Sequence, residues 1–157
     1  MTWRGSTTVP DRIFASLPYL LPLIDGLVFG QFLFTQFPVL QLLLIPLAPL
    51  RQIYDNLPFA SLIIFFALYL GVVRNENISH FIRFNAMQAI LLDIVLILCR
   101  LVLPIFDGLQ VAFIAETLYN MVFLGAFAAF VYAVVQSLLG RYAEIPPLSD
   151  AVYMQVR

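Results

Sequence analysis

Apolar residues run along the chain in four long blocks, separated by short polar or proline-rich stretches. The blocks cover about 13–34, 56–73, 85–103 and 110–139. Crossing about 30 Å of hydrocarbon takes about 20 helical residues, so each block is long enough, or nearly so, to cross a bilayer. The pattern predicts an all-α, polytopic membrane protein with four transmembrane helices. We expect one membrane domain over residues 1–157, with a short polar tail at 141–157.

The stretch between the first and second blocks, QFPVLQLLLIPLAPLRQIYDNL, is ambiguous. Three prolines deny it an uninterrupted spanning helix, which leaves an interfacial helix, a re-entrant segment or a fifth span as alternatives. The distribution of arginine helps to choose, because loops on the cytoplasmic side carry the excess of basic residues. Five spans divide the arginines without bias, whereas four spans gather six of them on the side of both termini: Arg4, Arg12, Arg74, Arg83, Arg141 and Arg157, against Arg51 on the other side and Arg100 within a helix near it. We therefore expect four spans, with residues 36–55 lying on or dipping into the far surface.

The composition agrees with this class of protein. Apolar residues make up 62% of the chain and charged residues only 11%, too few to build a water-facing surface, since soluble domains have about 25%. No basic run indicates nucleic-acid binding. The single cysteine, Cys99, lies in an expected span and reads as a packed thiol. The N-terminal residues resemble neither a cleaved signal peptide nor a transit peptide, which suggests a protein made in a bacterium or inside an organelle.

Small residues four positions apart predict the faces along which helices pack. Such spacing makes a flat groove that lets a second helix approach closely. The last block carries it through four residues, which is harder to ascribe to chance than a single pair. The predicted packing positions are Gly26, Gly30, Ala67, Gly71, Gly125, Ala129, Ala133 and Ser137.

Ionisable and amide side chains inside the apolar blocks form a candidate intramembrane polar network. Its members are Asp93, Arg100, Glu116 and Asn120. Folding the third and fourth spans about Asp107-Gly108 predicts an Arg100–Glu116 ion pair and an Asp93–Asn120 hydrogen bond. Such groups are costly in lipid, so they face protein or water. Two interpretations stay open: a wet path for a solute, proton or polypeptide, or polar contacts that hold the bundle together.

Other chemistry is largely missing from the sequence. His80 is the only histidine and nothing near it has the spacing of metal ligands. There is no glycine-rich phosphate loop and no motif of a hydrolase. We therefore expect no catalytic residues, no cofactor and no metal site.

Three stretches carry a resemblance to a known family. They are LPYLLP at 17–22, the proline-punctuated FPVLQLLLIPLAPL, and above all VVRN followed by HFIRFNAMQAILLDI. The chain resembles the TIC twenty-kilodalton family, the small four-span subunit of the protein translocon of the chloroplast inner envelope, with cyanobacterial and plastid-encoded relatives. The matching motif, expected to be a family-defining surface, comprises Arg74, Asn75, Phe81, Arg83, Phe84, Asn85, Met87, Gln88 and Ala89.

The resemblance implies a non-enzymatic subunit of a protein-translocation (TIC) complex, either channel-forming or a core assembly component. It also implies both termini on the stromal or cytoplasmic side of a plastid inner-envelope or cyanobacterial membrane. Expected partners are other membrane subunits, a second copy of the chain, a translocating polypeptide and the lipid bilayer, but no nucleic acid. Two rival functions remain: a small-solute transporter or channel using Asp93, Arg100 and Glu116, and an assembly factor for another membrane complex.

Overall fold

The computed structural model describes residues 7–156. Within them, three long helical units and one bent unit are the candidate membrane spans. The long units are Val9–Gln36, His80–Asp107 and Ala112–Leu138, each apolar and long enough to cross a membrane. The bent unit joins Ala48–Asn56 to Ala60–Val73 at an angle of 104° and makes a fourth candidate if it counts as one span. The predicted all-α membrane fold, with three to four candidate spans, is confirmed.

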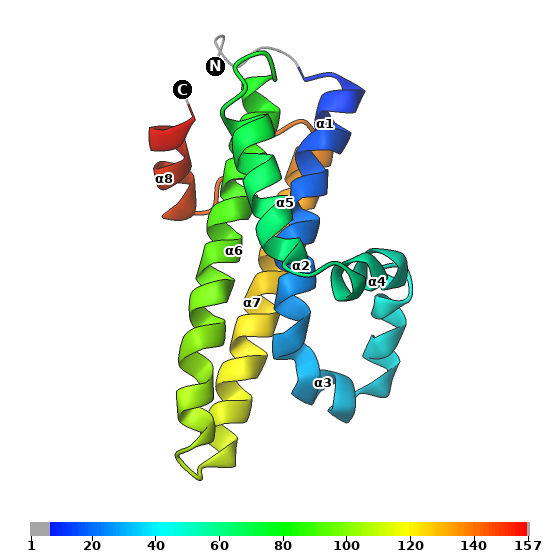
Figure 1. Cartoon of the computed structure of the whole chain (residues 1–157), viewed down its shortest axis with the longest axis vertical. Helices are drawn as coiled ribbons and strands as arrows, with labels where there is room; N and C mark the ends of the chain where they lie inside the picture. Colours follow the sequence, from blue (N-terminus) through cyan, green and yellow to red (C-terminus); the bar gives the residue numbers. More distant parts are fainter. Residues whose placement is uncertain (1–6, 157) are drawn as a thin grey trace.

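The elements follow one another as a series of helices without strands in the described part of the chain. In order, they are α1 (Val9–Ser16), η2 (Leu17–Tyr19), α2 (Leu20–Gly26), η3 (Leu27–Gly30), α3 (Gln31–Gln36), η4 (Pro38–Leu44), α4 (Ala48–Asn56), α5 (Ala60–Leu68), η5 (Tyr69–Val73), α6 (His80–Asp107), α7 (Ala112–Leu138) and α8 (Leu148–Gln155). Figure 1 shows α6 and α7 side by side along the long axis, with α1 and α2 against them and α8 beside the start of α6.

The first span is segmented by two 3₁₀ turns, η2 and η3, and a proline explains the first of them. Pro18 lacks the backbone N–H of an α-helix, and the chain tightens there into the 3₁₀ turn η2. The helix begins four residues earlier than the apolar block, at Val9, because Thr8 caps it. The Thr8 hydroxyl accepts from the Asp11 backbone N–H at 3.3 Å, and the Asp11 carboxylate accepts from the Thr8 N–H at 3.1 Å.

The second span is shorter than the others. It consists of the 9 residues of α5 and the 5 of the π-helical η5, a length of about 21 Å at 1.5 Å per residue against about 30 Å of hydrocarbon. The break before it falls at Phe59, whose φ of 58° is left-handed. Arg83 holds the C-terminal end of this span. Its Nε donates to the carbonyl of Val73 at 2.9 Å, one of the carbonyls that have no partner within the helix at its end.

The ambiguous segment forms η4 and α4 and does not continue straight into α5. Figure 1 shows α4 projecting sideways from the bundle. Large apolar side chains along it are exposed, among them Leu42 at 60% and Ile45 at 65%. A position on or in the far surface of the membrane remains a prediction for this segment.

Small residues do pack helices together, but over fewer positions than the spacing predicts. A Cβ added at Gly26 would touch Ala126 at 3.5 Å, and one at Gly30 would meet the Phe123 ring at 2.9 Å. Ala67 and Gly71 of the second span are exposed, so the predicted packing there is not found within the chain.

The four-residue stripe on α7 is buried only at Ala133 and Ser137. Gly125 is exposed, with nothing within 4 Å of an added Cβ, and Ala129 is half-buried. A step of four residues drifts by about 40° around a helix of 3.6 residues per turn. From 125 to 137 the stripe therefore turns by about 120° and leaves the contact face, which Tyr119, Phe123 and Ala126 occupy instead.

The two glycines give a direct test of this packing. Gly30→Ala should lower the unfolding temperature in detergent, because the new methyl group overlaps Phe123 and overpacking costs about 1–3 kcal/mol. Gly125→Ala is the matched control: alanine there meets open space and improves helix propensity, so the unfolding temperature should stay unchanged or rise. Equal shifts in the two variants would contradict the packing described.

Candidate functional site

The motif that opens α6 lies in the centre of the bundle. Phe84, Asn85, Gln88 and Ala89 are 0% exposed, and Phe81, Met87 and Arg83 are below 9%. Only Arg74 is exposed, and Asn75 is half-buried. The expectation that the motif forms a surface is therefore wrong for seven of its nine residues: α1, α2, η5, α7 and α8 all contact α6 and enclose its first turns.

Four side chains within this region make a buried polar junction: Tyr19, Asn85, Gln88 and Ser137. The Tyr19 hydroxyl donates to Asn85 Oδ1 at 2.7 Å, and Ser137 Oγ donates to the same oxygen at 3.1 Å. The Gln88 amide Nε2 donates to the Tyr19 hydroxyl at 2.9 Å. The junction thus joins η2, α6 and α7, the three units that form the bundle.

Gln88 also fastens the chain after α7. Its Nε2 donates to the Ala143 carbonyl, and its Oε1 accepts from the Ile145 backbone N–H at 3.3 Å. Asn85 completes its own set by donating from Nδ2 to the Phe81 carbonyl at 2.8 Å. Both amides are therefore satisfied in an apolar interior, where an unpaired group would cost about 1–3 kcal/mol.

Aromatic residues dock α8 against the start of α6. Phe84 packs between Tyr142 and Tyr153, with ring centroids 5.0 Å and 4.9 Å away. His80 Nδ1 lies 2.8 Å from the Tyr142 hydroxyl, and Tyr153 donates to Glu144 Oε1 at 2.7 Å. The segment after α7 is thereby folded onto the bundle as part of the core.

The predicted network of Asp93, Arg100, Glu116 and Asn120 is not brought together. Both carboxylate oxygens of Asp93 and the Oδ1 of Asn120 are buried without a hydrogen-bond partner among the described residues, so the predicted Asp93–Asn120 bond is wrong. Arg100 is exposed, while Glu116 lines a shallow groove with Gln31 and Gln36. The predicted Arg100–Glu116 ion pair is not found among residues 7–156.

The register of α6 against α7 explains this result. Asn85 meets Ser137, and Asp107 accepts from the Tyr119 hydroxyl at 3.2 Å. These contacts place residues near 130 opposite Asp93, about ten residues from Asn120, which is roughly 15 Å along a helix. The prediction folded the chain at Asp107-Gly108, but the connection runs on through Gln110, whose φ of 57° makes the turn.

Asp93 faces a different carboxylate, Asp25 of α2. The backbone packing brings them together, because Gly26, the residue after Asp25, lies against α6 with its Cβ position 3.4 Å from Leu96, one turn beyond Asp93. The two carboxyl groups are close enough to interact directly. Asp25 Oδ1 accepts from Ser61 Oγ of α5 at 2.6 Å. We call Asp25 and Asp93 the acid pair. In the sequence, Asp25 is a charged residue that interrupts the first apolar block, and no sequence pattern points to Asp93 as its partner.

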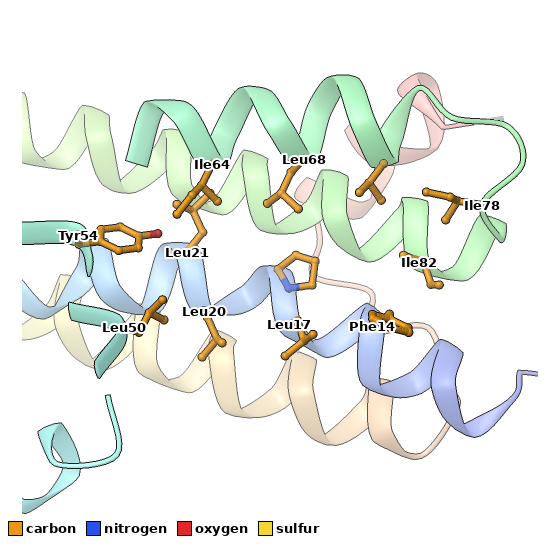
Figure 2. Close-up of a pocket in the computed structure, with 12 residues that line it drawn as sticks. Phe14, Leu17, Leu20, Leu21, Leu50, Tyr54, Ile64, Leu68, Ile78 and Ile82 are labelled. Carbon is orange, nitrogen blue, oxygen red and sulfur yellow. The ribbon is translucent and has the colours of Figure 1, made fainter. Parts of the chain in front are cut away.

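An apolar groove of about 470 Å³ lies between α1–α2 and α5–η5. Figure 2 shows Leu17, Leu20 and Leu21 on one wall, Ile64 and Leu68 on the other, and Tyr54 toward one end. Its walls are almost entirely hydrocarbon, so the groove suits an acyl chain or apolar side chains. Within the described ranges no group of three metal-ligating side chains occurs.

Known proteins are similar to this chain over nearly its whole length. The family model "Chloroplast import apparatus Tic20-like" matches residues 7–152. A Tic20 family protein of Synechocystis sp. is 57% identical over 153 residues, covering 94% of this chain and 93% of the relative. Protein TIC 20-II, chloroplastic, of Arabidopsis thaliana is 42% identical, covering 99% and 78%. The Tic20 family protein Ycf60 of Porphyra purpurea is 35% identical, covering 99% and 80%.

A double-mutant cycle tests the polar junction. Tyr19→Phe and Ser137→Ala each remove one of the two hydroxyl donors to Asn85 Oδ1, and each should lower the free energy of unfolding in detergent by about 1 kcal/mol. The double variant strips the oxygen of both donors, so it should lose about 1 kcal/mol more than the sum.

The control cycle pairs Ser137→Ala with Tyr119→Phe. Tyr119 donates to Asp107 near the other end of α7, so these two changes should be additive. Additive losses for Tyr19 and Ser137 as well would mean that the two hydroxyls do not act on one acceptor.

Proposed function

Because the chain belongs to the Tic20-like family of the chloroplast import apparatus, we propose that it is a non-enzymatic membrane subunit of a protein-translocation complex. The observation that carries this proposal is the extent of the match, which runs from residue 7 to residue 152. It includes the polar junction and the segment that the junction fastens. The region shared with the relatives is therefore the whole bundle rather than one local motif.

Within such a complex, we favour the role of a core assembly component over that of a solitary pore. Three or four helices cannot surround a polypeptide-wide channel. The polar side chains that meet at the centre of the bundle bond to one another, which supports a rigid unit. Asp93, Arg100 and Glu116 lie apart, so a transport path through these three residues is not favoured. Conduction of a polypeptide would need neighbours that complete a wall.

The partners that fit are other membrane proteins or a second copy of the chain. The small residues Ala67, Gly71 and Gly125 are exposed on helices that lipid or protein must cover. A Cβ added at Gly71 or Gly125 meets nothing within 4 Å, so a helix from another subunit can come close to the backbone there. A translocating polypeptide is a further candidate for the same faces.

The orientation follows from charge. Arg12 and Arg83 lie in the first turns of α1 and α6, and Arg74 and Arg141 closely follow η5 and α7. Figure 1 shows α1 and α6 beginning at the same end of the bundle. The remaining arginines of the predicted set, Arg4 and Arg157, lie outside the described residues. The positive-inside rule assigns this end to the cytoplasm of a cyanobacterium or the stroma of a plastid. The segment η4–α4 would then lie toward the opposite surface.

Site-specific photocrosslinking in native membranes tests the proposed role. A photoreactive residue at Gly71 or Gly125 should give adducts with other membrane proteins or with polypeptides in transit, because these positions face outward. The same probe in place of Ala133, which is 0% exposed, is the matched control and should give crosslinks within the chain only.

Mass spectrometry of the adducts distinguishes the outcomes. Translocon subunits or precursor polypeptides would support the proposal, and adducts between copies of the chain would point to a homo-oligomer. Adducts with lipid alone at both exposed positions, in actively translocating membranes, would contradict it.

A further inference from the structure

The acid pair sits where three helices meet inside the bundle. Asp25 comes from the end of α2 and Asp93 from the middle of α6, and Ser61 of α5 donates to Asp25. The Asp93 side chain is 1% exposed. Three carboxylate oxygens of the pair, Asp25 Oδ2 and both oxygens of Asp93, are buried without a hydrogen-bond partner in the described part of the chain. This is the reverse of the polar junction, in which both amides are satisfied.

Among residues 7–156, no cationic side chain is found in contact with the pair. The titratable group that approaches it from α4 is the phenol of Tyr54, which lies within electrostatic range of both carboxyls. The charged side chains of the same helix, Arg51 and Asp55, are exposed. On α7 the titratable side chains lie elsewhere: Glu116 lines a groove beside α3, Tyr119 bonds to Asp107, and Tyr132 bonds to the Glu144 carbonyl.

Along α6 itself, Arg100 lies two turns from Asp93 and is exposed. On α5 the pair meets the neutral hydroxyl of Ser61. The arginine of α1, Arg12, bonds to Thr7 at the far end of that helix. The two carboxyls therefore face each other without a positive neighbour.

Two ionised carboxylates in contact in an apolar interior repel each other, and neither can donate a hydrogen bond. One proton removes both problems, because the protonated carboxyl becomes a donor to the other. We propose that Asp25 and Asp93 bind one proton between them and that this shared proton fastens α2 to α6. The step is a simple acid–base equilibrium: the proton comes from water and one O–H···O hydrogen bond forms. The inference stands independently of the proposed function.

A shared proton makes the fold sensitive to pH in a defined direction. The folded chain holds a proton that the unfolded carboxyls release at neutral pH, so the folded state binds more protons and its stability falls as pH rises. Loss of the proton leaves two like charges between α2 and α6. Because Ser61 and Tyr54 adjoin the pair, we expect α5 and α4 to loosen first.

The test uses the full chain in nanodiscs of neutral lipid, with unfolding temperature measured between about pH 5 and pH 9, above the range in which free carboxyls titrate. Wild type should unfold at progressively lower temperature as pH rises. Asp93→Asn and Asp25→Asn each supply an amide donor in place of the proton, so both should lose most of that dependence. Asp107→Asn, outside the pair, is the matched control and should keep the wild-type slope.

Infrared difference spectroscopy gives a second readout that does not depend on folding energetics. Wild type should show the C=O stretch of a protonated carboxylic acid at neutral pH, and either asparagine variant should abolish it. If one variant fails to fold, the other and the wild-type spectrum still decide.

The proposal is overturned by any of three results. The first is a wild-type spectrum without a protonated carboxyl. The second is an unchanged pH slope in both asparagine variants. The third is stabilisation of wild type, but not of the variants, by Na⁺ or Ca²⁺ at constant ionic strength without a carboxylic acid signal, which would assign the pair to a metal cation.

Discussion

Satisfaction of the Asn85 and Gln88 amides is the constraint on which the rest of the bundle depends. Lipid offers no hydrogen bonds, so a buried amide in a membrane helix must find its partners within the protein. Here the partners come from η2, α7 and the segment after α7, through Tyr19, Ser137 and the backbone at 143–145. Apolar packing alone would let these helices slide or rotate at little cost in free energy. The hydrogen bonds of the two amides form in only one register of the helices.

The acid pair uses the same kind of position for the opposite purpose. Asn85 and Gln88 carry donors and acceptors in one side chain and can be satisfied permanently. Asp25 and Asp93 are acceptors only while ionised, so their contact depends on a species from outside the fold. The amide hydrogen bonds at one end of the bundle thus do not depend on pH, whereas the proposed proton between the carboxyls in its middle does. The short α5–η5 unit connects to both, through Arg83 at its end and Ser61 near its start.

Sequence reasoning could find the elements but not their partners. Block length and hydropathy predict the three long helices because crossing a bilayer demands them, and Pro18 predicts one of the two 3₁₀ breaks in the first. The predicted contact of Asp93 was wrong because the α6–α7 register depends on the left-handed backbone of Gln110. No hydrophobic pattern indicates that conformation. The motif was misplaced for a different reason. Its surface position was expected from a family resemblance, which carries no information on burial, whereas Asn85 and Gln88 are enclosed by helices remote in sequence.

The division between the inner and outer sides of the bundle bears on what the protein does. Its interior polar groups at the junction, Tyr19, Asn85, Gln88 and Ser137, bond to one another and to the backbone, while the acid pair and Asn120 keep buried atoms without a partner in the described part of the chain. Its exterior keeps small residues such as Gly71 and Gly125 without a covering helix, and α4 projects from the bundle with apolar side chains exposed. These outer positions, where a second helix can approach the backbone closely, are the feature that supports the proposed place of the chain among other membrane proteins. On that proposal, the polar interior fixes the chain's own helices and the outer faces make the contacts of the assembly.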